Sequence, residues 1–151
     1  MKKEEIIKLN DKEYTLQFNR ESFLKIDMLC NVSKSMQIIH KPLYKFYDNE
    51  ELTDDFDFSK LEISDEQIEK EIELKTNTLK KLGERAFLVW LKPNHNLNIS
   101  DVKEILKPYW EDEEKSAFIG SKIGEFLRKC VEIRDEYNEE RKNLEAQTNK
   151  K

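Results

Sequence analysis

The sequence predicts an α+β fold that is mostly α-helical, in which an N-terminal β-hairpin packs on a bundle of about four to five helices. Apolar residues alternate with polar ones near the N-terminus, and they recur at helical spacing through most of the remaining chain. Only 3 glycines and 3 prolines occur in 151 residues, which is too few for a turn-rich β fold. The length suits one domain. We expect residues 1–137 to form this single domain and residues 138–151 to form a polar, flexible C-terminal tail.

Residues 4–18 predict the hairpin. Apolar side chains alternate on both sides of the polar pair Asn10-Asp11, at Ile7, Leu9, Tyr14, Leu16 and Phe18. This spacing of two is typical of strands with one buried face. The turn has no glycine, so the sequence leaves its type open. Because an isolated hairpin is marginally stable in water, its apolar face is expected to lie on the helices.

The most apolar stretch, residues 79–91, predicts a helix at the centre of the domain. Apolar residues recur there at steps of three and four and also cover the neighbouring faces, so Phe87 and Trp90 are expected inside. Ser64 and Gln67 have the spacing of a capping box, and one helix is therefore expected over residues 65–91. Gly83 within it costs about 1 kcal/mol relative to alanine, which close packing of a neighbour would offset.

Capping residues and prolines delimit the other helices. Asn19 is expected to cap a helix over about residues 20–30, and a shorter helix is expected over about residues 33–40, before Pro42.

Two further helices are expected in the C-terminal half of the chain. Ser100 is expected to cap the first, which Pro108 would end. The second starts near residue 112 or 113 and continues toward Tyr137.

No catalytic, metal-binding or phosphate-binding pattern is recognisable in the sequence. His40 and His95 lie apart from other ligand-type residues and are interpreted as surface turn residues. Cys30 and Cys130 are expected to be buried, reduced thiols. The three glycines are isolated and form no phosphate-binding loop. We expect no cofactor, no metal and no small-molecule substrate, although an enzyme whose site assembles from scattered residues stays an open alternative.

Charge and targeting signals exclude several classes of partner. Acidic and basic residues, 32 and 27 in number, are mixed along the chain and give a net charge of −5. A nucleic-acid binder usually has a clustered basic footprint, so no nucleic acid is expected. The N-terminal apolar stretch is too short for a secretory signal, and no stretch is long enough for a membrane span. We therefore expect a cytoplasmic protein.

The middle of the chain contains the predicted partner-binding residues. Residues 48–64 are acidic and have no clear periodicity, so they are predicted to form a long loop. Apolar and aromatic residues are concentrated in and before this segment, at Leu43, Tyr44, Phe46, Tyr47, Phe56 and Phe58. Exposed apolar patches usually mark interaction sites. The alternative is that these rings fold back over the hairpin as a small additional core.

Two stretches carry a resemblance to a known family. One is KLNDKEYTLQFNRES at residues 8–22, and the other is FLVWLKPNH at residues 87–95, followed by a capped helix from Ser100 and a closing helix through Arg128. In this order they resemble the opening hairpin, first helix and later helices of the tail assembly chaperones of long-tailed bacteriophages. The matching portions cover about half of the 151 residues.

The resemblance implies a function without catalysis. It implies a chaperone in the host cell cytoplasm that binds the phage tape measure protein and keeps it soluble during tail construction. It also implies a homo-oligomer or a coat of copies along the partner, and a longer product made by ribosomal frameshifting. The family supplies no invariant functional residues. The alternative is a small regulatory or nucleic-acid-associated protein of a phage or prophage.

Overall fold

Two strands and five helices make up the described part of the computed structural model, which covers residues 3–41 and 64–148. In chain order they are β1 (Glu4–Leu9), β2 (Lys12–Gln17), α1 (Ser22–Cys30), α2 (Val32–His40), α3 (Asp65–Leu91), α4 (Ile99–Trp110) and α5 (Glu113–Thr148). The predicted α+β fold, mostly helical with an N-terminal hairpin, is confirmed. The predicted bounds of α3 are confirmed as well, including the capping box between Ser64 and Gln67.

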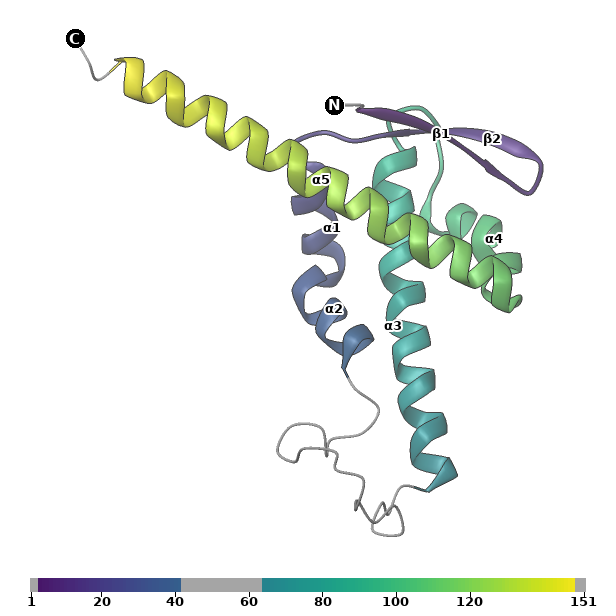
Figure 1. The fold of residues 1–151 in the computed structure, drawn as a ribbon. Coiled ribbons are helices and arrows are strands. Elements are labelled where there is room, and N and C mark those ends of the chain that lie inside the picture. Colours follow the sequence, from purple (N-terminus) through teal and green to yellow (C-terminus); the bar gives the residue numbers. More distant parts are fainter. Residues whose placement is uncertain (1–2, 42–63, 149–151) are drawn as a thin grey trace, which may run out of the picture.

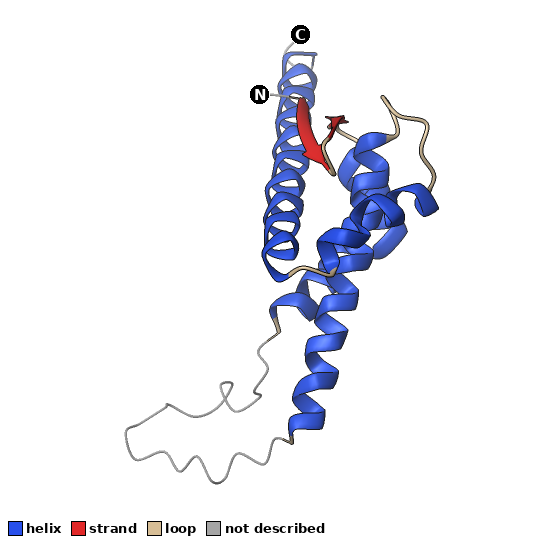
Figure 2. Cartoon of the chain, turned by 90° about the vertical axis from the view of Figure 1, so that its right-hand side faces the viewer, coloured by secondary structure: helices blue, strands red, loops and turns tan. Residues whose placement is uncertain are grey.

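Helix α3 is the element on which the others are assembled (Figure 1). Helices α1 and α2 pack along one side of it, while α4 and α5 pack on its C-terminal half together with strand β2. The N-terminal half of α3 extends away from this assembly, as Figure 2 shows from the side. The buried residues of α3 reflect this arrangement, because all of them lie between Leu82 and Leu91.

The two strands pair antiparallel with Glu4 opposite Gln17 and Leu9 opposite Lys12. The two turn residues, Asn10 and Asp11, have positive φ angles of 53° and 64°. A two-residue turn with positive φ at both positions matches the right-handed twist of the strands, and Asn and Asp tolerate this conformation better than most residues. The five alternating apolar residues that predicted the hairpin are all buried.

Side chains from the C-terminal half of the chain tether the hairpin. The backbone N–H of Asn10 donates to the Tyr109 hydroxyl at 3.0 Å, and the Asn10 side chain donates to the Ile105 carbonyl at 2.8 Å. The Thr15 N–H donates to Nε2 of His95 at 3.0 Å. The interpretation of His95 as a surface turn residue is therefore corrected, since its ring holds strand β2 against the turn after α3.

Four aromatic rings form the centre of the core. Phe18 from the end of the hairpin, Phe87 and Trp90 from α3, and Phe126 from α5 are all fully buried. Trp90 lies 5.5 to 5.7 Å, centroid to centroid, from each of the other three rings, in edge-to-face geometry. The predicted burial of Phe87 and Trp90 is confirmed. The hairpin, the central helix α3 and the last helix α5 therefore share one hydrophobic core.

The predicted starts of α1 and α4 differ from the structure. Asn19 does not cap α1: its Oδ1 accepts from the Glu21 N–H at 2.9 Å, within the turn that precedes the helix. Helix α4 is capped by Asn98 instead of Ser100, in a capping box with Asp101.

The predicted end of α4 at Pro108 is also wrong, because this proline lies inside the helix. Pro108 is exposed and near the helix end, and the buried ring of Tyr109, whose hydroxyl binds the hairpin, fixes the final turn beyond it.

The prediction of a polar, flexible tail from residue 138 is wrong in one respect, because this segment is helical. Helix α5 continues through Thr148, well past Tyr137, and projects beyond the other elements in Figure 1. Residues 138–148 are exposed, as their polarity predicts, but they consist mostly of good helix formers. Arg141 and Glu145 also form an i,i+4 ion pair at 3.4 Å, which favours the helix.

Gly83 marks a close approach between α3 and its neighbours. A Cβ at this position would lie 2.5 Å from Cδ1 of Ile123 and 3.2 Å from the Trp110 ring. The close neighbour expected at this glycine is present, and the offset of the helix-propensity cost stays a prediction. Gly124 in α5 offers a contrast, since a Cβ there would meet no atom within 4 Å.

We expect opposite effects from alanine at these two glycines. Gly83→Ala should lower the free energy of unfolding by about 1 to 2 kcal/mol, because overpacking against buried Ile123 exceeds the gain in helix propensity. Gly124→Ala should raise it by up to about 1 kcal/mol, since it gains propensity without a clash. Urea denaturation of both variants measures the difference. A Gly83→Ala variant as stable as Gly124→Ala would contradict the packing described here.

Candidate partner-binding surfaces

The residues predicted from the sequence to bind a partner lie outside the described residues. All six fall within residues 42–63: Leu43, Tyr44, Phe46, Tyr47, Phe56 and Phe58. Their assignment stays a prediction. The described part of the chain presents two other surfaces.

The first surface is an apolar groove between α1 and α3, with a volume of about 570 Å³. We call it the α1–α3 groove and define it by Lys25, Met28, Leu29, Leu88, Val89 and Lys92. Met28 is 79% exposed and Leu29 is 47% exposed, whereas Leu88 and Val89 are half-buried. Two lysines accompany the four apolar side chains. The groove therefore offers apolar surface to water with positive charge beside it.

Only part of the apolar set of α1 faces the core, and Met28 and Leu29 do not. Ile26 is fully buried and Phe23 packs against the core, whereas Leu24, Met28 and Leu29 point outward. Six of the nine residues of α1, SFLKIDMLC, are apolar. One face of a nine-residue helix cannot bury so many, and this excess was the signal for an exposed apolar face.

Hydrogen bonds at the junction between α1 and α2 fix the position of the groove. Asn31 adopts the left-handed conformation, with φ of 46°, and closes α1, while its side chain accepts from the Lys34 N–H and begins α2. The Asp27 carboxylate accepts from the Val32 N–H at 2.8 Å. Lys75 of α3 donates to the carbonyls of Ile38 and Ile39 at the end of α2. These hydrogen bonds join α1 to α2 and join the end of α2 to α3.

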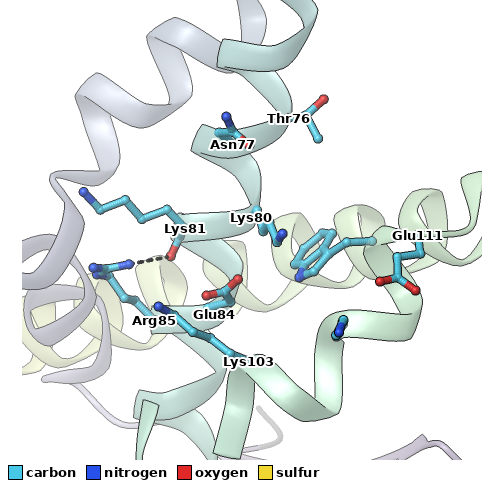
Figure 3. Close-up of a pocket in the computed structure, with 10 residues that line it drawn as sticks. Thr76, Asn77, Lys80, Lys81, Glu84, Arg85, Lys103 and Glu111 are labelled. Carbon is cyan, nitrogen blue, oxygen red and sulfur yellow. Dashed lines mark hydrogen bonds between the residues drawn. The ribbon is translucent and has the colours of Figure 1, made fainter. Parts of the chain in front are cut away.

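The second surface is a cleft of about 580 Å³ between α3 and α4 (Figure 3). Its α3 wall includes Lys80, Lys81, Glu84 and Arg85, and its α4 wall includes Lys103, Lys107, Trp110 and Glu111. Lys80 and Glu84, Lys81 and Arg85, and Lys103 and Lys107 are each four residues apart, so each wall is one helix face, which Glu111 extends just beyond the end of α4. We call this surface the α3–α4 cleft. The sequence analysis missed it because its bases come from two helices that are distant in the sequence.

Two polar groups in the α3–α4 cleft lack partners among the described residues. The indole N–H of Trp110 is buried and has no hydrogen-bond acceptor. Glu84 is only 5% exposed, and its carboxylate has neither an ion pair nor a hydrogen bond to another described residue. Buried polar groups are nearly always satisfied in native proteins. Among the described residues, the Trp110 N–H is therefore an unsatisfied buried donor, whereas the Glu84 carboxylate lines the open cleft without a protein partner.

The two cysteines are free thiols in different environments. Cys130 is fully buried and accepts a hydrogen bond from Nε1 of Trp90 at 3.2 Å. Burial raises the pKa of the Cys130 thiol to about 11, against a smaller lowering by this hydrogen bond. Cys30 is half-buried and donates to the Ile26 carbonyl. The expectation of two buried thiols thus holds for Cys130 and is corrected for Cys30.

Within residues 3–41 and 64–148, no helix combines the length and the apolar character that crossing a membrane requires. The same residues contain no group of three or more His, Cys, Asp or Glu side chains arranged to bind a metal ion. No protein-family model, curated protein or solved structure matches the chain.

Proposed function

We propose that this protein is a non-enzymatic tail assembly chaperone. It binds the tape measure protein of a phage tail in the host cell cytoplasm and keeps that partner soluble by covering its apolar helical segments. The observation that supports this proposal is the α1–α3 groove, in which Met28 and Leu29 expose apolar surface next to Leu88 and Val89. The resemblance of residues 8–22 and 87–95 to the chaperone family supplies the identity of the partner.

The chemistry of the groove suits an amphipathic helix as its occupant. Such helices commonly bind by placing their apolar face into a groove of this kind. Methionine is unbranched and flexible, so Met28 can adapt to different apolar sequences, as a chaperone for a long partner requires. Lys25 and Lys92 beside the apolar residues match acidic residues that flank an apolar stripe. The proposal includes self-association, either as a homo-oligomer or as several copies along the partner.

We expect Met28→Glu to abolish most of the holding activity without unfolding the chaperone. A charge in the groove opposes burial of the partner's apolar face, whereas the native contacts of an exposed methionine are few. The test is co-expression with the tape measure protein of a long-tailed phage. The soluble fraction of that partner should fall several-fold with the variant, while the thermal midpoint of the chaperone stays unchanged.

Leu144→Glu is the matched control, because Leu144 is also an exposed apolar residue, 64% accessible, but lies at the far end of α5. It should keep the partner as soluble as the wild-type chain does. If Met28→Glu performs as well as Leu144→Glu, the groove is not the holding surface. If the wild-type protein itself leaves the partner insoluble, the chaperone proposal fails.

A small regulatory or nucleic-acid-associated protein is the second candidate, and the bases of the α3–α4 cleft favour it. The net charge of −5 and the two glutamates of the cleft weigh against it. Binding to DNA that appears at low salt and disappears as salt is added would support this alternative.

A further inference from the structure

The α3–α4 cleft is positively charged in a chain that is negative overall. Five bases and two acids line it, a formal charge of +3, whereas the whole chain carries −5. None of the five bases forms an ion pair with another described residue. Like charges held at one site repel each other, and an anionic ligand would remove this repulsion. The charge therefore indicates an anionic occupant.

Trp110 and Glu84 restrict the chemistry of that occupant. The Trp110 N–H needs an acceptor, which any carboxylate or phosphate supplies. An occupant of the cleft would displace solvent from the Glu84 carboxylate and would have to supply a donor, which an anion alone does not do. A ligand that satisfies the whole cleft must therefore combine negative charge with at least one N–H or O–H donor. Acidic peptides have this combination, because amide, hydroxyl and ammonium side chains accompany their carboxylates.

We propose that the α3–α4 cleft binds an acidic segment of the partner protein. Carboxylates of the segment pair with Lys103, Lys107 and the bases of α3, one acceptor meets the Trp110 indole, and one side-chain donor meets Glu84. This inference rests on the proposed function, since it describes a second segment of the same partner. Both surfaces use α3, with residues 76–85 in the cleft and residues 88–92 in the α1–α3 groove.

A nucleic acid fits the cleft less well than an acidic peptide. Its backbone presents closely spaced phosphates that carry only acceptors, so a strand in the cleft would bring these charges close to Glu84 and Glu111. Pairing Glu84 with a donor would require a base edge to reach the cleft. A peptide places charge and donors at separate, variable positions. The arrangement of unpaired groups thus favours the peptide.

The test is selection from a displayed library of random peptides by the full chain, followed by affinity measurement. We expect the selected peptides to be enriched in Asp and Glu over the unselected library. A fluorescein-labelled synthetic copy of the best peptide should bind about tenfold or more weakly to a Lys103→Glu, Lys107→Glu double variant, because each reversal replaces an attraction with a repulsion. Both lysines are exposed, so the variant should keep its circular dichroism and thermal midpoint.

The control double variant Lys34→Glu, Lys142→Glu makes the same change of net charge at exposed positions on α2 and α5. It should bind the labelled peptide like the wild-type chain. If both double variants weaken peptide binding equally, the weakening comes from the net charge of the protein and the proposal is overturned. Labelled DNA that binds more tightly than the peptide, and loses binding only with the cleft variant, would assign the cleft to nucleic acid instead.

These experiments distinguish a failure of the chaperone proposal from a failure of the cleft proposal. The selected peptides could be apolar, show no enrichment in acidic residues and lose binding with Met28→Glu. This result would support the chaperone function and overturn the cleft proposal. Acidic peptides that require Lys103 and Lys107, combined with a partner that the wild-type chain leaves insoluble, would support the cleft and overturn the chaperone function.

Discussion

Trp90→Ala is expected to lower the free energy of unfolding by about 3 to 5 kcal/mol, the largest loss among the substitutions considered. The indole is fully buried and contacts the rings of Phe18, Phe87 and Phe126, which come from three separate elements. Alanine would leave a cavity at the point where hairpin, α3 and α5 meet. Because the chain has 2 tryptophans, urea denaturation is best followed by far-ultraviolet circular dichroism.

Phe118→Ala is the control for this experiment. Phe118 is also aromatic, but it is 42% exposed; its ring stacks on Tyr109, at 6.5 Å between ring centroids, and lies 5.9 Å from Nζ of Lys122. Its removal should cost about 1 kcal/mol or less. Equal losses for the two variants would show that Trp90 does not hold the three elements together, contrary to the packing described above.

The stability of the protein is expected to fall as the pH rises from about 9 to about 11, partly because of Cys130. The ordinary pKa of the thiol is 9.0, and burial raises it to about 11 in the folded state. Between these values the unfolded chain loses the proton while the folded chain keeps it. The folded state then binds more protons, so its stability decreases with pH, by about 2 to 3 kcal/mol in total.

Cys130→Ala isolates this contribution. The variant lacks the thiol but shares every other titrating group, so its free energy of unfolding should decrease less over the same pH range. The difference between the two pH profiles, rather than the absolute stability, is the measurement, since alanine also leaves a small cavity beside Trp90. Parallel profiles for the two proteins would contradict the raised pKa of Cys130.

Local patterns were enough to predict most of the elements. The hairpin follows from the alternation around Asn10 and Asp11, and α3 follows from its apolar stripe and the capping box at Ser64. These signals act between residues that are near in the sequence, so one sequence contains them in full. The predicted end of α5 near Tyr137 is wrong because it rests on the lack of apolar residues after Tyr137. The polar residues that follow Tyr137 have good helix propensity and continue the helix. Pro108 was misjudged because tertiary contacts of Tyr109 hold the last turn of α4.

The two candidate surfaces depend on contacts between distant segments. Met28 and Leu88 lie far apart in the sequence, and periodicity indicates which residues of a helix are apolar but not which of two apolar faces is covered. The α3–α4 cleft likewise combines Lys81 and Arg85 with Lys103 and Lys107 across the turn between two helices. A mixed charge pattern along the chain therefore concealed a local excess of positive charge.

The tethers of the hairpin join segments that are synthesised far apart in time. Glu5 of β1 forms an ion pair with Lys129 of α5, which follows 124 residues later, and Asn10 forms a hydrogen bond with the distant Tyr109. At roughly 5 to 20 residues per second, the interval between Glu5 and Lys129 is about 6 to 25 s. During this interval the nascent hairpin lacks α5, so Phe18 cannot pack against the Phe126 ring. Completion of the core therefore waits until the segment of α5 that carries Phe126 and Lys129 has been synthesised.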